Sequence, residues 1–236
     1  MGMKNITVLD LIEAAQAPGC LMCTLRQKLV EGYIRGLFNE HINDPPSREK
    51  LRHSHGLCPE HSWLAIDSQL GNALGVAIIS QDVIGKLLND LADLESKPDP
   101  LARLKQLVRN NSKPQTQWFA PEDICPACQH KAIAEERIQK TLMGSLHLPE
   151  LSEAIAQSDG ICLPHLRLLL ALAAPSESTQ ILLDLTNQKW QSLRAELAEF
   201  IRKNDYRFSK EGFGDERDSW LRATALINGN HPGSGS

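Results

Sequence analysis

The sequence has little that would suit it to a membrane or to nucleic acid. Its longest uncharged apolar runs, residues 73–79 and 168–174, are seven residues each, whereas a membrane-spanning helix needs about 20 apolar residues. It also lacks an excess of basic residues, with 25 Lys and Arg against 29 Asp and Glu and a net charge of −4. We therefore expect neither a membrane protein nor a protein that binds the phosphate backbone through a basic surface.

The N-terminal residues lack the apolar core of a signal peptide. Asp10 and Glu13 interrupt the segment before Cys20, and a secretory signal needs an unbroken apolar stretch there. Hydrophobic residues make up 42% of the chain and charged residues 23%, which is typical of a folded soluble protein. These features favour a cytoplasmic protein with a packed core.

Six cysteines and two histidines form a repeated pattern. Each half of the chain carries a C-x-x-C pair, a long spacer and a C-x-x-H pair, and the spacers hold 34 and 33 residues. The eight residues are Cys20, Cys23, Cys58 and His61 in the first half, and Cys125, Cys128, Cys162 and His165 in the second. Such an internal repeat predicts two similar structural units.

The repeat extends beyond these eight residues. An offset of 104 places Gly56 on Gly160, so that each C-x-x-H pair follows a glycine and one apolar residue. The similarity covers residues 20–66 and 125–170, together with the helix expected after each. The whole unit is therefore duplicated, and not the ligand motif alone.

The residue types of the repeat suit a structural zinc ion. Three thiolates and one imidazole form a closed tetrahedral set that leaves no position for water, and one ion then joins distant chain segments and couples metal binding to folding. We expect two zinc ions per chain. The alternatives are a disulfide framework, an iron–sulfur cluster or redox thiols, and unligated buried cysteines. Two filled zinc sites would lower the net charge to about −6, which further disfavours a nucleic-acid partner.

The ligand pairs can close within each repeat or across the two. We expect each C-x-x-C pair to share an ion with the C-x-x-H pair of its own repeat, because closing the shorter loop costs less entropy. In the crossed alternative, Cys20 and Cys23 would meet Cys162 and His165.

Three further histidines lie near the motifs. His53, His55 and His130 are close enough in sequence to replace or support a ligand. None has a counterpart in the other half of the chain, so we expect them to be solvent-exposed surface residues.

Helical periodicity runs through nearly the whole chain, and no strand alternation or hairpin signal is present. We predict an all-α fold of two pseudo-repeated helical units, each held by a CxxC…CxxH metal site, with long packing helices that bury Leu91 and Ile201. The main helices are expected over residues 47–54, 74–94, 151–158 and 179–203. The expected segments are a first repeat over 3–96, a linker helix and loop over 97–121, a second repeat over 122–203, a C-terminal segment over 204–228, and a disordered tail or added residues over 229–236.

The C-terminal segment adds a second recognisable motif. It consists of Asp205-Tyr206-Arg207-Phe208, Gly214-Asp215-Glu216 and Trp220. Together with the duplicated cysteine motifs it resembles an uncharacterised bacterial family, a domain of unknown function with a duplicated CPxC…GLCxxH arrangement. The resemblance covers most of residues 20–228, and the chain departs from it at Leu21, where a proline is expected as at Pro126. It implies the helical fold and the metal sites, and no established activity.

Recognisable catalytic motifs are absent. The sequence has no Gly-rich phosphate loop, nucleophile elbow or H-E-x-x-H motif, and a catalytic zinc usually has only three protein ligands. We therefore predict a non-enzymatic two-zinc helical protein that acts as a protein-interaction or scaffold module, with another protein as its partner. The alternatives are a metal or thiol redox sensor or iron–sulfur protein, and an enzyme with a site between the repeats near Asp205 and Arg207. The sequence gives no indication of oligomeric state.

Overall fold

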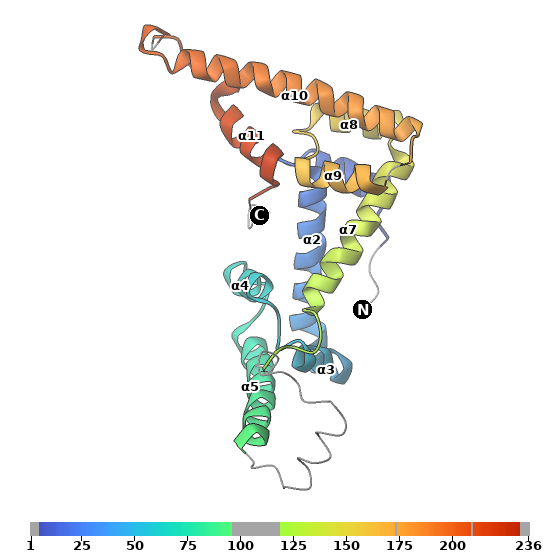
Figure 1. The fold of residues 1–236 in the computed structure, drawn as a ribbon, viewed down its shortest axis with the longest axis vertical. Coiled ribbons are helices and arrows are strands. Elements are labelled where there is room, and N and C mark those ends of the chain that lie inside the picture. The colour runs from blue at the N-terminus through green and yellow to red at the C-terminus, as the bar shows by residue number, and fades with distance from the viewer. Residues whose placement is uncertain (1–4, 96–118, 173, 209, 232–236) are drawn as a thin grey trace, which may run out of the picture. The chain divides into compact units, whose positions relative to one another are not determined.

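The computed structural model describes residues 5–95, 119–172, 174–208 and 210–231 (Figure 1). Over these residues the chain forms ten α-helices and a few short helical turns, and no strand. The predicted all-α class is confirmed. Most of the expected linker over 97–121 lies outside the described residues. None of the described helices has the length and apolar composition needed to cross a membrane.

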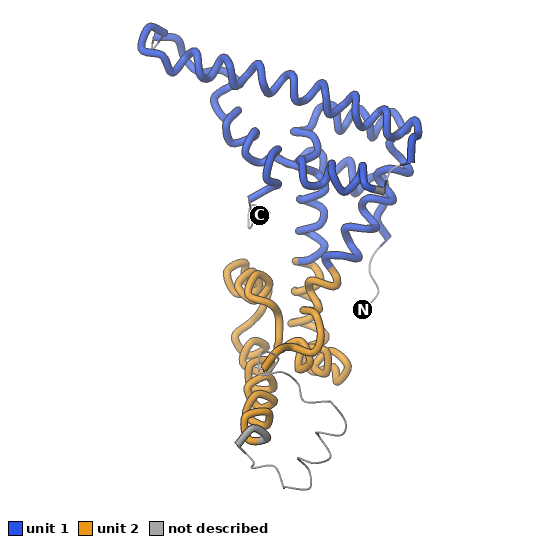
Figure 2. Tube along the Cα trace, viewed as in Figure 1, with its two compact units in different colours: residues 1–30, 131–236 blue, residues 31–130 orange. Residues whose placement is uncertain are grey.

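The chain divides into two compact units (Figure 2). Unit 1 comprises residues 1–30 and 131–236, and unit 2 comprises residues 31–130. Helix α2 (Leu21–Gly36) begins in unit 1 and ends in unit 2, and α7 (Pro126–Ser145) begins in unit 2 and ends in unit 1. Each unit therefore contains elements of both sequence repeats.

Unit 1 contains the larger set of helices. Besides its parts of α2 and α7, these are α1 (Val8–Ala15), α8 (Pro149–Gln157), α9 (Leu163–Leu172), α10 (Glu177–Lys203) and α11 (Ser219–Asn228), with 3₁₀ turns over Tyr206–Phe208 and Asp215–Asp218. Helix α8 packs against α1 and α10, and α11 packs against α9 and α10. The helices predicted over residues 151–158 and 179–203 are confirmed as α8 and α10.

The main hydrophobic core lies in unit 1. Its 18 residues include Ile138 and Leu142 of α7 and Leu146 directly after that helix, all of which are fully buried. Cys20, Cys23 and Cys162 belong to the same core, so the first metal-ligand candidates are surrounded by packed apolar side chains. Ile201 was expected to point inward but is 70% exposed, because the apolar stripe of α10 extends past the helices that pack on it.

Unit 2 is built from shorter helices and one long one. These are α3 (Pro45–His53), α4 (Pro59–Asp67) and α5 (Ala73–Glu95), which follow the end of α2 and a π-helical turn over Leu37–His41. Helix α3 packs on α5, and the guanidinium group of Arg48 donates to both carboxylate oxygens of Asp82, at 2.7 and 2.6 Å. The helices expected over 47–54 and 74–94 are confirmed. Leu91 was predicted to be buried and is instead 43% exposed.

Helix starts follow from local sequence. Thr7 and Asp10 form a reciprocal capping box at α1, and the Asp44 carboxylate accepts the Ser47 N–H ahead of α3, whose first residue is Pro45. Side-chain acceptors satisfy first-turn N–H groups that have no helical partner. These caps fix where α1 and α3 begin.

Candidate metal centres

All four ligand pairs have the same local structure. The first cysteine of each pair directly precedes a helix, and its carbonyl accepts the N–H of the residue four positions later, at 2.8 to 3.0 Å. The helices are α2 after Cys20, α4 after Cys58, α7 after Cys125 and α9 after Cys162. The second ligand follows three residues later, in the first turn. The unpaired N–H groups and the dipole at a helix N-terminus favour a thiolate there.

The structure groups the eight predicted residues into two clusters. Cluster 1, in unit 1, contains Cys20, Cys23, Cys162 and His165, and cluster 2, in unit 2, contains Cys58, His61, Cys125 and Cys128. Within each cluster the ligand atoms all lie within 4.8 Å of one another. Each C-x-x-C pair therefore meets the C-x-x-H pair of the other repeat. The predicted closure within each repeat is wrong, and the crossed alternative is the one observed.

The crossed pairing follows from the stiffness of the spacers. Helix α2 has 16 residues and ends at Gly36, so after Cys23 it carries the chain about 20 Å along the helix axis. Helix α3 has only nine residues, or about 14 Å, and is too short to return the chain over that distance. The entropy of closing a flexible loop does not apply to a spacer that is mostly helix, so the shorter sequence separation gives no advantage.

The geometry of cluster 1 fits a tetrahedral ion. Nδ1 of His165 lies 3.5 Å from the Sγ atom of Cys20, 3.4 Å from that of Cys23 and 3.1 Å from that of Cys162. The Sγ atoms of Cys23 and Cys162 are 3.8 Å apart. Ligands at usual zinc distances from one centre stand about 3.6 Å (N to S) and about 3.8 Å (S to S) apart. The donor set and its spacing therefore suit zinc.

Cluster 2 has nearly the same geometry. Nδ1 of His61 lies 3.1 Å from the Sγ atom of Cys58, 3.7 Å from that of Cys125 and 3.4 Å from that of Cys128. The Sγ atoms of Cys58 and Cys128 are 3.6 Å apart. All six cysteines are free thiols, and these sulfur separations exceed the length of a disulfide bond. Both clusters can hold a metal ion with four protein ligands.

The thiols of each cluster shift one another's pKa values. In cluster 1, hydrogen bonding with Cys162 raises the pKa of Cys20 well above its ordinary value and lowers the pKa of Cys23 far below it. In cluster 2, burial and the neighbouring Cys58 raise the pKa of Cys128 to about 12. Thiolates packed this closely repel one another, so they cannot all ionise unless a cation lies between them. A bound metal supplies that cation.

A carboxylate supports the histidine of cluster 1. Nε2 of His165, on the side of the ring opposite the sulfurs, lies 2.9 Å from Oε1 of Glu135, and Arg26 donates to the same oxygen at 3.0 Å. The contact with His165 lowers the pKa of Glu135. Burial opposes protonation of His165, but the thiols of Cys162 and Cys23 and the Glu135 carboxylate raise its pKa to about 11. A carboxylate in this position fixes the tautomer and orientation of a metal-binding imidazole.

The C-terminal residues also contact cluster 1. The Asn230 side chain accepts the Cys20 N–H at 2.7 Å and donates to Oγ1 of Thr24 at 3.1 Å, and its backbone N–H donates to Sγ of Cys23 at 3.5 Å. Gly229, at φ 90°, lies against Cys23 and Cys162, where an added Cβ would sit 3.5 and 3.9 Å from their sulfurs. We expected residues 229–236 to be a disordered tail or added residues. For Gly229 and Asn230 this is wrong, since they cover the cluster, and residues 232–236 lie outside the described part.

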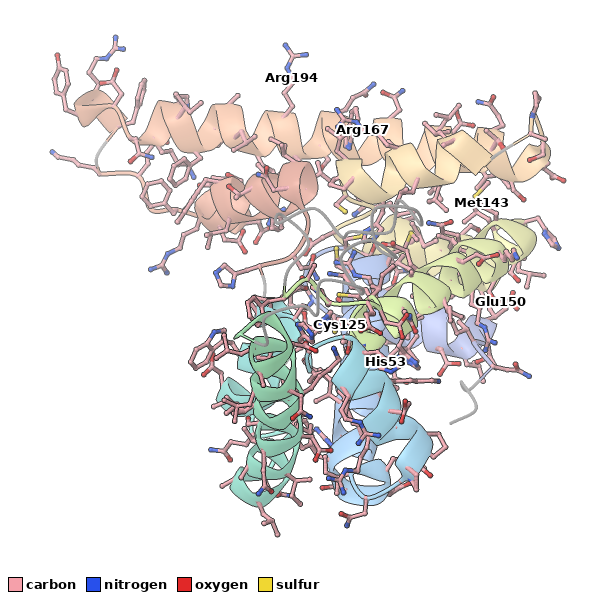
Figure 3. All side chains as sticks on the ribbon, turned by 60° about the horizontal axis from the view of Figure 1, so that its bottom comes forward. His53, Cys125, Met143, Glu150, Arg167 and Arg194 are labelled. Carbon is pink, nitrogen blue, oxygen red and sulfur yellow. The ribbon has the colours of Figure 1, made fainter. Side chains whose placement is uncertain are left out.

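Cluster 2 is less deeply enclosed. Cys58 and Cys128 are only half-buried, whereas all four residues of cluster 1 are buried. The loop leading to Cys125 is held to the end of α3, because the backbone N–H groups of Glu122 and Asp123 donate to the carbonyl of His53 at 2.8 and 3.2 Å. His53 and Cys125 are both labelled in Figure 3. This loop is the local scaffold that presents the second C-x-x-C pair.

The three additional histidines lie outside both clusters. His53 lies 3.2 Å from the Glu49 carboxylate on the surface of α3, and His130 stacks on Tyr33 with ring centroids 4.5 Å apart. His55 has a left-handed backbone, at φ 54°. None of the three belongs to either cluster.

The C-terminal motif makes local ion pairs. Arg207 donates to Asp205 at 2.6 Å, so the two residues considered for an enzyme site form an ion pair with each other. Glu216 is buried and accepts from Lys203 at 2.7 Å, and these contacts lower the pKa of Glu216 to about 2. The motif thus ties the end of α10 to the turn before α11.

Sequence alone missed Glu135, Arg26 and Asn230. Glu135 and Arg26 lie on helices whose sequences suggest only solvent-exposed charge, and their role follows from the crossed pairing that brings α2, α7 and α9 together in unit 1. Asn230 lies 207 residues after Cys23 and carries no motif. No signal in a single sequence could have placed it at the cluster.

Comparison with known proteins gives a family and no activity. The family model DUF6062, described as a family of unknown function, matches residues 2–234. The chain is also similar to the "uncharacterized 23.9 kDa protein in xynA 3'region" of Caldicellulosiruptor sp. (strain Rt8B.4), with 24% identity over 221 residues, which cover 93% of this chain and 99% of that protein. No solved structure matches the chain at a significant level. The resemblance to an uncharacterised family is confirmed.

Proposed function

The chain belongs to DUF6062, a family of unknown function, and we propose that it is a non-enzymatic, two-zinc helical protein that presents a binding surface to another protein. The observation that carries the proposal is that each cluster provides four protein ligands at tetrahedral spacing. A catalytic zinc keeps a position open for water or substrate, whereas a four-ligand set is typical of a structural ion. The zinc, when bound, supplies the positive charge that lets three thiolates share one centre.

The proposed role of the metals is to hold the ends of helices. In each cluster the ion would join the N-termini of two helices that are far apart in sequence, α2 with α9 and α4 with α7. Metal binding of this kind contributes directly to folding free energy. We place the protein in the cytoplasm, where free thiols stay reduced and available to the metal.

Metal analysis of the purified protein tests this proposal. Protein purified without added metal should contain two zinc ions per chain and show no absorption in the visible range. Iron with visible charge-transfer bands would replace the structural role with a redox or iron–sulfur role. A folded protein without metal would contradict the proposal.

A thiol redox response is the second candidate, and the exposure of cluster 2 favours it. Cys58 and Cys128 are half-buried with sulfurs 3.6 Å apart, within reach of a disulfide after a small movement. Hydrogen peroxide would accept two electrons from these two thiolates and, after uptake of two protons, would become two water molecules. The two sulfurs would form one disulfide bond, and the zinc ion that they had bound would be released. Peroxide titration with a zinc-sensitive dye should then release one ion well before the second. Simultaneous release of both ions would exclude a cluster 2 switch.

A further inference from the structure

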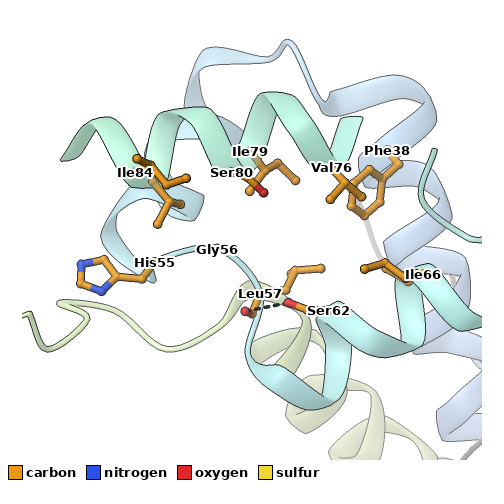
Figure 4. A pocket seen from close by; sticks show the side chains of 12 residues that line it. Phe38, His55, Gly56, Leu57, Ser62, Ile66, Val76, Ile79, Ser80 and Ile84 are labelled. Atoms are coloured by element: carbon orange, nitrogen blue, oxygen red, sulfur yellow. Dashed lines mark hydrogen bonds between the residues drawn. The ribbon is translucent and has the colours of Figure 1, made fainter. Parts of the chain in front are cut away.

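An open apolar groove lies in unit 2 between α4 and α5 (Figure 4). It has a volume of about 250 Å³. Helix α5 forms one wall with Val76, Ile79, Ser80, Val83 and Ile84, and α4 with the loop before it forms the other. We call this space the α4–α5 groove. Ile84, at one end of it, is 55% exposed.

Unit 1 contains the equivalent surface on α10. The α10 residues that line it are Leu182, Leu185, Thr186, Lys189 and Trp190, each 106 positions after its counterpart on α5. Gly160 and Ile161 lie opposite them, as Gly56 and Leu57 do in unit 2, and both glycines have positive φ, 89° and 86°. The repeat therefore extends to the long helices, and the two spaces are duplicates of one structural feature.

In unit 1 this surface is covered by a helix. Leu226 of α11 lines the space, whose volume is only about 10 Å³, which is about the volume needed for a single water molecule. One turn earlier on α11, Arg222 pairs with Glu196 of α10. Helix α11 thus docks through one apolar side chain and one cation spaced four residues apart.

In unit 2 no helix of the described residues has the role of α11. Asp90 occupies on α5 the position of Glu196 on α10, 106 residues earlier, and its side chain is 38% exposed while accepting from Lys86 at 3.2 Å. His55 lies at the Ile84 end of the groove (Figure 4). Its Nε2 atom is buried and has no hydrogen-bond partner among the described residues, which is a state that normally carries a free-energy cost. The groove therefore offers an apolar wall and, further along the same helix, an accessible carboxylate.

We infer that the α4–α5 groove binds an amphipathic helix of a partner protein, in the way that α11 packs on unit 1. The partner helix presents a leucine-like side chain to the groove and, four residues earlier, an arginine or lysine to Asp90. In helix-in-groove binding of this kind, the groove recognises apolar side chains that recur at helical spacing on the bound helix. The inference rests on the proposed function, and it names the surface and the class of partner.

A peptide with the sequence of α11 serves as the probe. The peptide spans residues 218–229, carries fluorescein, and is held helical by a lactam bridge between positions 220 and 224, which are both exposed on α11. Fluorescence anisotropy with the full zinc-loaded chain should show saturable binding. A peptide with Leu226→Asp should bind at least about tenfold more weakly, because a charge would replace the apolar anchor.

Three protein variants locate the binding site. Ile84→Arg, at an exposed groove position, should weaken binding at least about tenfold, whereas Leu74→Arg, also on α5 but outside the groove and 72% exposed, should leave it unchanged. Asp90→Arg should weaken binding several-fold, and a peptide with Arg222→Glu should restore it. Circular dichroism and zinc content confirm that each variant is folded.

Each other outcome overturns the inference in a distinguishable way. No saturable binding to a chain that holds two zinc ions would reject the groove and leave the proposed metal sites standing. Binding that appears only when residues 99–115 are replaced by a Gly/Ser sequence of equal length would mean that the chain fills its own groove. A dimer in sedimentation that Ile84→Arg dissociates would mean that a second copy fills it. A folded chain without metal would instead reject the proposed function.

Discussion

The two clusters have the same ligands and different surroundings. Cluster 1 is fully buried in the 18-residue core of unit 1, where Glu135 supports His165 and Asn230 covers the cysteines. Cluster 2 has two half-buried cysteines, and the core around cluster 1 includes no residue of unit 2. A metal ion in unit 1 would add to this large core, whereas in unit 2 it would support a smaller set of buried side chains that includes Ile34, Phe38 and Leu51. Duplicated motifs can thus carry different shares of the folding free energy.

Metal removal should produce the largest difference in stability between the two units. Structural zinc is worth about 10–16 kcal/mol in small zinc-binding peptides, which is as large as the whole stability of an ordinary domain. Chelation should therefore abolish the hydrogen-exchange protection of α3, α4 and α5, while α7 and α8 keep part of theirs. Hydrogen exchange read by mass spectrometry measures both units in one sample. Equal loss in the two units would show that the core of unit 1 gives it no independent stability.

Loss of the carboxylate beside His165 should weaken one site only. Glu135→Gln keeps the shape of the side chain and removes its charge, and changes of this kind usually lower metal affinity about 10- to 100-fold. Competition with a chelating dye should show one weakened zinc and one unchanged zinc. Glu136→Gln is the matched control, since Glu136 is exposed and pairs with Lys140. A similar loss in both variants would mean that Glu135 acts only through general charge.

Acid should release the metal from both clusters. In the metal-free protein the Cys128 thiol, with its pKa raised to about 12 by burial, and His165, with its pKa raised to about 11, are protonated at neutral pH. Metal binding must displace these protons, so affinity falls as pH falls, by about tenfold per pH unit for each proton displaced. Zinc occupancy at buffered free zinc, measured across a pH series, gives the slope. An occupancy independent of pH would contradict thiol and imidazole ligation.

The contact of Asn230 with cluster 1 should have the smallest effect. Asn230→Ala removes the side-chain hydrogen bonds to Cys20 and Thr24 and should cost unit 1 about 1–2 kcal/mol. Zinc should leave cluster 1 a few times faster in a chelator-driven release assay. Asn228→Ala provides the control, because that side chain donates to the Thr224 carbonyl within α11. Equal rates in the two variants would show that residues 229–230 do not shield the metal.

The sequence predicts the parts of this protein better than their assembly. Cysteine spacing identified all eight residues of the two clusters, and periodicity placed α3, α5, α8 and α10. These are local properties, since spacing and periodicity act within one or two helical turns. The pairing of the motifs was predicted wrongly because it depends on the stiffness of α2 and α7, which carry each C-x-x-C pair away from its own C-x-x-H pair.

The limits of burial prediction have a related cause. Leu91 and Ile201 fit the apolar periodicity of their helices, yet both are largely exposed. Periodicity shows which face of a helix is apolar, and only tertiary packing decides how much of that face is covered. The exposed part of α5 is the part that differs from α10, whose equivalent surface is covered by α11.

Paired cysteine substitutions test the crossed arrangement directly. Cys58→Ser with Cys125→Ser removes two ligands of cluster 2 only, so the protein should keep one zinc per chain. Cys20→Ser with Cys58→Ser removes one ligand from each cluster and should leave no tightly bound zinc. Zinc per chain, measured by mass spectrometry after dialysis against a chelator, gives both numbers. The reverse result, no zinc in the first double variant and one in the second, would show that each repeat closes on itself and would contradict the crossed clusters.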